Sequence, residues 1–343
     1  MEAAYKQEKS YYFDKVFDSN SSTIEMYQRA LTPAIQNVIN GFNSTILAYG
    51  MTGAGKTFTM FGDIYNSMGG IASHPGIVSL VVRDLFQTFK KESENGYEFN
   101  VKLSYLEIYN EHARDLLTPG SEELMIIEDS RRGIMIPNLT EFAITAHDEV
   151  VKYIVQGNSR RIMASTNANQ FSSRSHAIIQ FTVEKRSKTK DIVDSFLQSK
   201  LCLVDLAGSE RAAVSDNKGL RQREGANINR SLLALGNCIN ILSDSNKKGA
   251  FVPYRDSKLT RLLKDSLGGN TRTVMLACVS PSYLAYEETI NTLKYASGAR
   301  NIKRKIMRNI KEVQLHVSEY KGIIESLRVE VDALKHKLAE STF

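Results

Sequence analysis

The stretch Gly50-Met51-Thr52-Gly53-Ala54-Gly55-Lys56-Thr57 has the residue types and the spacing of a phosphate-binding loop. Its glycines allow the backbone to curl so that successive N–H groups point at an anion. Lys56 can reach the β and γ phosphates of a nucleotide, and the Thr57 hydroxyl can bind Mg²⁺. A plain glycine-rich turn is the alternative, but the apolar run 44–49 predicts a buried strand that leads directly into the loop.

A second apolar run, at 200–206, ends with an aspartate, Asp205, and is followed by Gly208. In phosphate-loop NTPases an aspartate at the end of such a strand helps to hold Mg²⁺. The backbone N–H of Gly208 can donate to a γ-phosphate. For Asp205 alone a helix cap or a loop carboxylate is an equal alternative, and the phosphate loop favours the metal role, through a water shell.

The stretch 169–176 is dense in hydroxyl groups and ends where a strand is expected. Ser172 and Ser173 are the right type of group to hold a γ-phosphate, the attacking water and Mg²⁺. A polar loop is the alternative for this stretch alone. A strong general base is not required, because phosphoryl transfer depends mainly on positioning and charge stabilisation.

Hydrophobic periodicity predicts an α/β domain of three layers over residues 1–300. Apolar spacing predicts helices at 23–40, 77–91, 148–163 and 227–242. Alternating or continuous apolar runs predict strands at 11–17, 44–49, 99–109, 177–185 and 200–206, with short strands between 123 and 144. No stretch within 1–300 has the composition of a linker, so we expect a single domain.

Composition is ordinary for a soluble globular protein, with 42% hydrophobic and 24% charged residues. The net charge of +6 favours an acidic partner, which could be nucleic acid, a membrane or an acidic protein surface. Cys202, Cys238 and Cys278 lack metal-type spacing, so we expect inert thiols in a reduced intracellular chain. We also expect neither a signal peptide nor a membrane span.

Three motifs together resemble the kinesin motor domain. NxxSSRSH at 169–176 is similar to switch I, DLAGSER at 205–211 to switch II, and AYGMTGAGKTFTM at 48–60 to the kinesin phosphate loop. The resemblance runs from about residue 11 to 309 and includes the stretches 105–111, 227–236 and 253–263. It implies the P-loop NTPase kinesin motor fold, with a mostly parallel central sheet between helices, and a microtubule-stimulated ATPase that uses ATP and Mg²⁺.

The resemblance also implies roles for individual residues. Ser172 and Ser173 would close on the γ-phosphate, Gly208 would sense it, and Arg174 and Glu210 would form the ion pair that closes the site. The implied Mg²⁺ set is Thr57, Ser173 and, through water, Asp205, and the ring of Phe58 would lie beside adenine. The family's Arg-x-Arg-Pro segment, which packs on adenine, is not found before Tyr11, so specificity for ATP rests on the resemblance. A guanine signature, Asn-Lys-x-Asp, is also not found, which argues against a GTPase.

Two basic clusters fall where kinesins contact tubulin, whose surface is acidic. A solvated face is the alternative for such charges; complementary charge would instead make microtubule binding sensitive to salt. The helix at 227–242 corresponds to the one that docks between tubulin subunits and is connected to switch II. The implied microtubule contacts are Lys218, Arg221, Arg223, Arg255, Lys258 and Arg261.

Residues 301–309 resemble the kinesin neck linker, with Asn309 at the latch position, and a neck after the core resembles that of plus-end-directed kinesins. Residues 310–343 are predicted as a neck helix at the start of a coiled coil. A dimerising coiled coil is favoured over a helix that docks on its own head. The expected seam, with alternating spacings of three and four, is Val317, Tyr320, Ile324, Leu327, Val331, Leu334 and Leu338.

Within the superfamily, the stretches 309–320 and 267–272 look most like the kinesin-8 group, including its kinesin-19-like branch. That group combines plus-end motility with depolymerisation of microtubule ends in some members. The resemblance implies a cytoplasmic location on the microtubule cytoskeleton, with the spindle or the axoneme as candidates. Two alternatives are a tubulin- or microtubule-end-binding protein with little turnover and an unrelated NTPase acting on nucleic acid. For the second the sequence offers no recognition motif, and we expect neither a nucleic acid nor a membrane partner.

Overall fold

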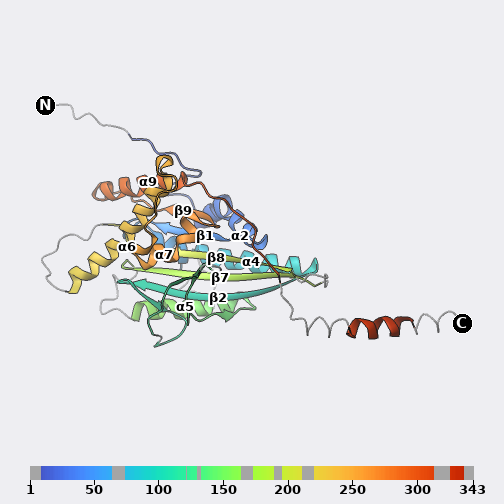
Figure 1. Ribbon diagram of the computed structural model, residues 1–343. Helices are drawn as coiled ribbons and strands as arrows, with labels where there is room; N and C mark the ends of the chain where they lie inside the picture. Colours follow the sequence, from blue (N-terminus) through green and yellow to red (C-terminus); the bar gives the residue numbers. More distant parts are fainter. Residues whose placement is uncertain are drawn as a thin grey trace, which may run out of the picture.

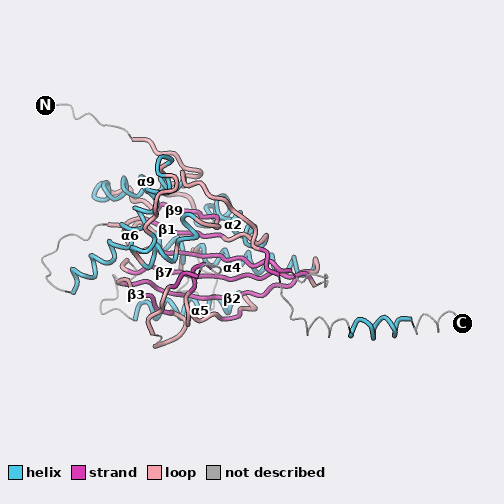
Figure 2. The backbone as a smooth tube through the Cα atoms, viewed as in Figure 1, coloured by secondary structure: helices cyan, strands magenta, loops and turns pink. Residues whose placement is uncertain are grey.

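A single sheet forms the centre of the molecule in the computed structural model, and helices cover both of its faces (Figures 1 and 2). The structure describes residues 9–63, 74–120, 122–129, 133–163, 173–188, 195–210, 220–312 and 325–335. The main strands follow the order β3-β2-β7-β8-β1-β9. Their bounds are β3 (His112–Asp115), β2 (Tyr97–Tyr109), β7 (Ser175–Ser187), β8 (Ser195–Asp205), β1 (Ser44–Tyr49) and β9 (Arg272–Ala277).

Strand direction divides this sheet into two parts. β1 pairs in parallel with both β8 and β9, whereas β7 is antiparallel to both β8 and β2. Thus β2, β8, β1 and β9 run in one direction, and β7 and β3 run in the other. All six residues of β1 are buried, as expected for a central parallel strand covered on both faces. The C-terminal ends of β1 and β8 therefore lie side by side.

Three further pairings extend or accompany the main sheet. β6 (Phe142–Ala143) pairs with β2, and β10 (Ile310–Glu312) pairs with β8. β4 (Ile127–Asp129) and β5 (Gly133–Met135) form a separate two-stranded sheet. β10 lies just past the predicted neck linker, so the docked part of the neck continues beyond residue 309.

One helical layer is packed against the face of the sheet formed by residues such as Ile46, Leu103 and Phe181. Apolar side chains repeat along α4 at helical spacing, from Ile77 to Phe89, and turn one stripe toward the sheet. The members of this layer are α1 (Thr23–Met26), the π-helix η1 (Tyr27–Leu31), α2 (Thr32–Ile39), α3 (Lys56–Phe61), α4 (Ile77–Glu94) and α5 (His147–Met163).

The second helical layer covers the opposite face, where Leu47, Ile178 and Val204 are packed against it. The three-layer α/β prediction is therefore confirmed, while the single-domain boundary at residue 300 stays a prediction. The members of this layer and its connections are α6 (Leu220–Ser243), η3 (Ser245–Lys247), η4 (Tyr254–Asp256), α7 (Lys258–Leu262), α8 (Lys264–Gly268), η5 (Tyr283–Ala285) and α9 (Tyr286–Arg300).

The structure differs from the predicted elements in three places. Residues 310–312, predicted as the start of the neck helix, form β10 because they pair with β8. Residues 11–17 form no strand, and Tyr12 and Val16 are 74% and 73% exposed, so their β-propensity has no sheet edge to act on. The helix predicted at 23–40 contains the π-helical turn η1, whose widening is explained by Pro33. Proline has no N–H to donate to the carbonyl four residues earlier.

Within the described part of the chain, the helices are too short or too polar to cross a membrane. Residues 325–335 form a helix whose side chains are all exposed. They include Leu327, Val331 and Leu334 of the predicted seam, at 53%, 47% and 59% exposure. The seam residues Val317, Tyr320, Ile324 and Leu338 lie outside the described residues.

Candidate nucleotide-binding site

The phosphate loop connects β1 to α3, and its glycines are required by its geometry. Gly50 has a φ of 149°, and a Cβ there would lie 2.1 Å from the carbonyl oxygen of Cys278. Gly53 and Gly55 have φ values of 80° and 92°, in the region that disfavours side chains. Gly55 is the residue that precedes α3. The loop therefore places the N-terminus of α3 beside the space that a phosphate would occupy.

Lys56 is folded back onto this loop. Its side chain is nearly buried, and its Nζ donates to the carbonyl oxygen of Met51 at 2.9 Å. Burial lowers the pKa of Lys56, while the carboxylates of Asp205 and Glu210 act in the opposite direction. An ammonium group that already has a loop carbonyl as partner can exchange it for a phosphate oxygen without moving far.

Thr57 and Asp205, predicted as Mg²⁺ residues, meet at the adjacent ends of α3 and β8. The Thr57 hydroxyl donates to Oδ2 of Asp205 at 2.8 Å. Oδ1 of Asp205 is buried and has no hydrogen-bond partner among the described residues. The described residues contain no cluster of three or more metal-binding His, Cys, Asp or Glu side chains. This chemistry fits Mg²⁺ held by one hydroxyl, phosphate oxygens and water, rather than by a protein cage.

Arg161 is a site residue that the sequence analysis missed. It is 2% exposed, and its Nη1 donates to Oδ2 of Asp205 at 3.1 Å. Its Nε and Nη2 donate to the hydroxyl and the carbonyl of Ser175 at 3.0 and 2.9 Å, and its Nε lies 3.7 Å from Oε1 of Glu107. Burial acts to lower the pKa of Arg161, but the neighbouring Asp205 and Glu107 carboxylates leave it raised.

A sequence signal for Arg161 did exist. It follows Val150, Ile154 and Asn158 at helical spacing on the buried stripe of α5, so a charged residue stands where an apolar one is expected. Buried charges of this kind are normally paired. The arginine fixes the orientation of Asp205 and connects β7, β2 and β8 beneath the phosphate loop.

The predicted switch residues lie against the phosphate loop. The N–H of Gly208 donates to the carbonyl of Ser173 at 2.8 Å, and the N–H of Ser209 donates to Gly50 at 3.1 Å. Oε2 of Glu210 accepts from the N–H of Thr52 at 2.7 Å, and its Oε1 accepts from the Thr52 hydroxyl. The three motifs are therefore assembled in one place.

Two parts of this prediction stay open. The ion pair between Arg174 and Glu210 stays a prediction. Ser172 lies outside the described residues.

An exposed aromatic pair borders the phosphate loop. Phe58, predicted to lie beside adenine, is 51% exposed, and its ring centroid is 6.0 Å from that of His74. Nδ1 of His74 lies 3.0 Å from Oδ2 of Asp63, which orients the imidazole. The two rings are tilted by 49°, so an exposed face of one ring, rather than a common plane, can stack on a nucleobase.

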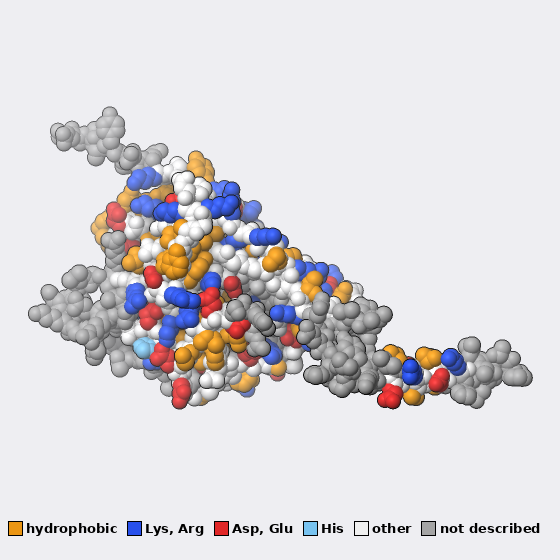
Figure 3. All heavy atoms as spheres, viewed as in Figure 1, with side chains coloured by type: hydrophobic (Ala, Val, Ile, Leu, Met, Phe, Trp, Pro, Cys, Tyr) orange, Lys and Arg blue, Asp and Glu red, His pale blue; other side chains and the backbone are white. Residues whose placement is uncertain are grey.

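The η4–α7 surface, defined by Arg255, Lys258 and Arg261, carries three of the predicted microtubule contacts. Arg255 lies 3.6 Å from Glu128, and Lys258 pairs with Glu123. Figure 3 shows basic and acidic side chains interspersed over the side of the molecule that carries α6 and α7. Nε of Arg261 is buried and lacks a hydrogen-bond partner among the described residues, and Arg255 is the most exposed of the three.

The other three predicted microtubule contacts are less completely described. Arg221 and Arg223 belong to α6, but their side chains lie outside the described residues, as does all of Lys218.

Glu111 caps the N-terminus of α7, which begins at Lys258 of the η4–α7 surface. Its carboxylate accepts from the Ser257 hydroxyl at 2.7 Å and from the Lys258 N–H at 2.8 Å.

The neck segment lies along the edge formed by β8 and the end of α2. Asn309 donates its N–H to Gly41 at 2.8 Å and its Nδ2 to Asn43 at 2.9 Å. Its Oδ1 accepts from Asn270 at 2.9 Å, and its carbonyl accepts from the N–H of Gln198 at 3.2 Å. The residue predicted as the latch therefore binds four core residues, which belong to the α2–β1 connection, the α8–β9 connection and β8.

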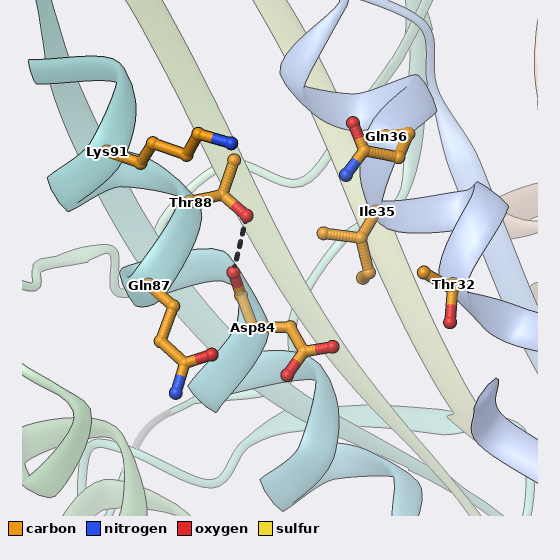
Figure 4. A pocket seen from close by; sticks show the side chains of 7 residues that line it. All are labelled: Thr32, Ile35, Gln36, Asp84, Gln87, Thr88 and Lys91. Carbon is orange, nitrogen blue, oxygen red and sulfur yellow. Dashed lines mark hydrogen bonds between the residues drawn. The ribbon is translucent and has the colours of Figure 1, made fainter. Parts of the chain in front are cut away.

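Two cavities lie away from the phosphate loop. The first, of about 230 Å³, lies between α2 and α4 (Figure 4), where Thr88 donates to the carbonyl of Asp84 at 2.7 Å. Its polar side chains, including Gln36 and Lys91, surround an open hollow without a buried polar group pointing into it. The second, of about 590 Å³, lies beside β3 and is lined by Arg114 and Arg160. Neither cavity includes a predicted site residue.

Comparison with known proteins agrees with this geometry. The family model for the kinesin motor domain matches residues 1–302. The chain is 48% identical to human kinesin-like protein KIF19 over 344 residues, covering 100% of this chain and 33% of KIF19. It is 46% identical to kinesin-like protein KIN-8B of Arabidopsis thaliana, covering 97% of this chain and 40% of that protein. The chain thus spans about a third of the curated relatives' length.

A solved structure is also similar. It contains a KIF14 dimer with two heads bound, in the AMP-PNP state, in complex with a microtubule. That chain is 34% identical, with a TM-score of 0.79, and the match covers 89% of this chain and 86% of the other.

Proposed function

This chain belongs to the kinesin motor domain family, and we propose that it is a microtubule-stimulated ATPase motor of the kinesin-8 group. The observation that carries the proposal is the assembly of three elements at one place. The phosphate loop, the Ser173 carbonyl and the Gly208–Glu210 turn are joined by direct hydrogen bonds. Such an arrangement can detect whether a γ-phosphate is present, because the same backbone groups would contact it.

The proposed chemistry is hydrolysis of ATP, with each side chain acting by position or charge. The loop amides and Lys56 hold the β and γ phosphates, and Phe58 stacks on the base. Ser172 and Ser173 close over the γ-phosphate and the attacking water, and Arg174 with Glu210 completes the closed site. Phosphoryl transfer needs little more than this alignment and charge stabilisation.

Thr57, Ser173 and Asp205 would hold Mg²⁺, the last through water. When bound, the ion neutralises charge that develops on the phosphate oxygens. Arg161 fixes one oxygen of Asp205 at 3.1 Å and leaves the other, Oδ1, for water. Removing the guanidinium would leave two buried carboxylates without their cation, so Arg161 supports both the site and the fold.

The proposed partner is the microtubule, contacted by α6 and the η4–α7 surface through Lys218, Arg221, Arg223, Arg255, Lys258 and Arg261. In KIF19-like proteins the motor is a fraction of a longer chain, so the dimeric state, the cargo and the action of the whole protein are also proposals. We propose a homodimer joined after the neck, latched by Asn309, moving toward plus ends and shortening microtubule ends. Its location would be the microtubule cytoskeleton, at the spindle or the axoneme.

The switch pair provides a direct test. Arg174→Ala and Glu210→Ala should each lower steady-state ATPase by about 100-fold, because the site can bind but not close around the attacking water. Nucleotide should remain bound in both variants, and their thermal unfolding should resemble that of the wild type. Glu92→Ala is the matched control, because it breaks a 2.7 Å pair with Lys185. Normal turnover in both switch variants would refute the assignment.

A further inference from the structure

His176 is a buried imidazole that the proposed ATPase chemistry does not use. It is the second residue of β7 and is 2% exposed. Its neighbour Ala177 pairs with Asp205, so His176 lies beside the point where β8 leaves the sheet and leads into the Gly208 turn. A polar ring in this interior position needs partners for both of its nitrogen atoms.

Both ring nitrogens of His176 have partners, and the two partners belong to different elements. Nδ1 accepts from the backbone N–H of Ala207 at 3.0 Å, while Nε2 lies 2.8 Å from the hydroxyl of Ser231 in α6. Because Nδ1 accepts, the proton of the neutral ring is on Nε2, which donates to Ser231. Burial, together with the charges of Arg161 and Lys56, lowers the pKa of His176 to about 3, so the ring stays neutral.

The amide that His176 holds precedes the one that is expected to sense the nucleotide. Ala207 donates to His176, and the next N–H, that of Gly208, donates to the carbonyl of Ser173 at 2.8 Å. If the Gly208 N–H turns toward a γ-phosphate, the backbone rotates at Ala207, whose own N–H is tied to the imidazole. A change at the phosphate therefore reaches the ring through one residue.

On the Nε2 side of the ring, the hydrogen bond to Ser231 connects His176 to α6. The side chain of Ser231 is 2% exposed and faces inward, whereas the preceding residue, Arg230, donates its Nε to the carbonyl of Asp256 in η4 at 3.2 Å. Asp256 is adjacent to Arg255 on the η4–α7 surface. Two consecutive α6 residues thus connect the imidazole to the proposed microtubule contacts.

We propose that His176 is a positioning residue that couples the Gly208 turn to α6, so that microtubule contact and phosphate sensing bias the same backbone. The inference rests on the proposed function. Each hydrogen bond can be kept or lost as the turn moves, which makes the imidazole part of a two-state element. His176 touches neither nucleotide nor track in this account.

Ser231→Ala tests the coupling without altering the nucleotide site. The expected result is that maximal microtubule stimulation of the ATPase falls by about fivefold or more. ATPase without microtubules should stay within about twofold of the wild type, because the substitution changes none of the residues that are proposed to bind nucleotide. Ser231→Thr, which retains the hydroxyl, should restore the stimulation. Ser266→Ala is the matched control, because it removes another buried hydroxyl pair, with Thr45 at 2.8 Å.

The outcomes separate this inference from the proposed function. If the wild type shows no stimulation by microtubules, the motor assignment itself fails. If the wild type is stimulated and Ser231→Ala is stimulated equally, the imidazole only satisfies a buried amide and the coupling is refuted. Loss of stability in Ser231→Ala with an unchanged stimulation ratio would also refute it.

A second measurement uses the unmodified chain and does not depend on a variant that folds. With ¹⁵N-labelled histidine, NMR should show one neutral ring protonated on Nε2 that does not titrate between about pH 5 and 8. The proposal predicts that these ring signals shift when ADP is replaced by a non-hydrolysable ATP analogue. Identical signals in the two nucleotide states would overturn it.

Discussion

Lys56 illustrates how a buried charge is prepared for its ligand. Its ammonium is held by the Met51 carbonyl at 2.9 Å, and burial lowers its pKa. Keeping this amine charged costs free energy that the Asp205 and Glu210 carboxylates offset only in part, and a bound phosphate would add further opposite charge. The same residue therefore lowers the stability of the empty loop and favours its occupied form.

Lys56→Met should separate these two effects. We expect ATPase activity to fall by about 100-fold or more, because the cation opposite the β and γ phosphates is lost. The melting temperature should be unchanged or higher, because an apolar chain of similar shape replaces a desolvated amine. Differential scanning calorimetry and a phosphate-release assay measure both. Lys200→Met, at an exposed position of β8, should change neither; a Lys56→Met protein with wild-type turnover would contradict the site.

His176 also makes a prediction about pH. Its folded pKa of about 3 lies below the ordinary 6.5, so the unfolded chain binds a proton that the folded chain excludes. Its contribution to stability is therefore complete above pH 6.5 and is lost as pH falls toward 3. The free energy of unfolding should drop by up to about 1.4 kcal/mol per pH unit from this group alone.

Urea titrations at pH 7, 6 and 5 would measure this slope. His176→Asn should flatten it, since the titrating group is gone, whereas His74→Asn, at a side chain that is 67% exposed, should alter it less. An equal slope in the wild type and His176→Asn would show that the imidazole is not held neutral by the fold.

At the residue scale, the sequence predicted the side chains that belong to a nucleotide-binding motif. It did not predict the buried side chains that hold those motif residues in place. Lys56, Thr57 and Asp205 are recognisable because phosphate chemistry demands their spacing. Arg161 and His176 act through contacts between segments that are far apart in the chain, namely β7, β8 and α6. Such contacts depend on strand order, which residue spacing alone does not determine.

At the scale of elements, the η4–α7 surface combines basic side chains with acidic partners from the β4 region. Glu123 pairs with Lys258 and, at 2.8 Å, with His112; Glu128 pairs with Lys264 and Arg255. Because these carboxylates pair with the proposed microtubule contacts Arg255 and Lys258, they would compete with an acidic partner for the same cations. Exposed pairs of this kind are weak and easily exchanged.

Glu123→Gln and Glu128→Gln should each strengthen microtubule binding. We expect the microtubule concentration for half-maximal ATPase to fall by about two- to fivefold per substitution, as one exposed pair is released. The salt dependence should become steeper. Glu92→Gln, remote from this surface, is the control. Weaker binding in the variants would mean that the carboxylates orient the cations rather than compete for them.

Helices and strands were predicted correctly where the hydrophobic pattern is long. The prediction failed where a strand can form only if a neighbouring strand is available to pair with it. The continuous apolar run of β1 and the periodic stripes of α4 correspond to elements of the structure. Residues 11–17 have strand composition but no described ladder to join. The π-helical turn before Pro33 follows from one missing N–H. Hydrophobic periodicity is read over many residues and does not detect such a local change.

At the scale of the whole molecule, the helix at 325–335 is relevant to whether the protein is a monomer or a dimer. Leu327, Val331 and Leu334 are 53%, 47% and 59% exposed, although they have coiled-coil spacing. A few heptads are a short seam, so we expect residues 1–343 alone to associate only weakly. In the full-length protein, Leu327→Lys together with Leu334→Lys should convert dimers to monomers in sedimentation equilibrium, with ATPase per head retained. A dimer that persists would place the association elsewhere.

The fold connects the proposed nucleotide site to the proposed microtubule contacts and to the segment around Asn309 through a series of hydrogen bonds. The N–H of Ser209, the residue after Gly208, donates to Gly50 of the phosphate loop, and His176 connects this turn to α6. Asn309 joins the predicted neck linker to the edge of the core. The kinesin motor fold supplies the arrangement, and the buried polar contacts supply the coupling. Any coupling along this series of hydrogen bonds must appear as a change in ATPase when the track is bound.

The most direct test is the steady-state ATPase rate of this chain measured with increasing concentrations of stabilised microtubules, with filament length recorded in the same samples. The account predicts a rate that rises and saturates with microtubules and filaments that shorten from their ends. Stimulation without shortening would leave a transport motor and contradict the proposed depolymerisation. A rate that is the same with and without microtubules, while the chain still sediments with them, would contradict the central claim and leave a binding protein.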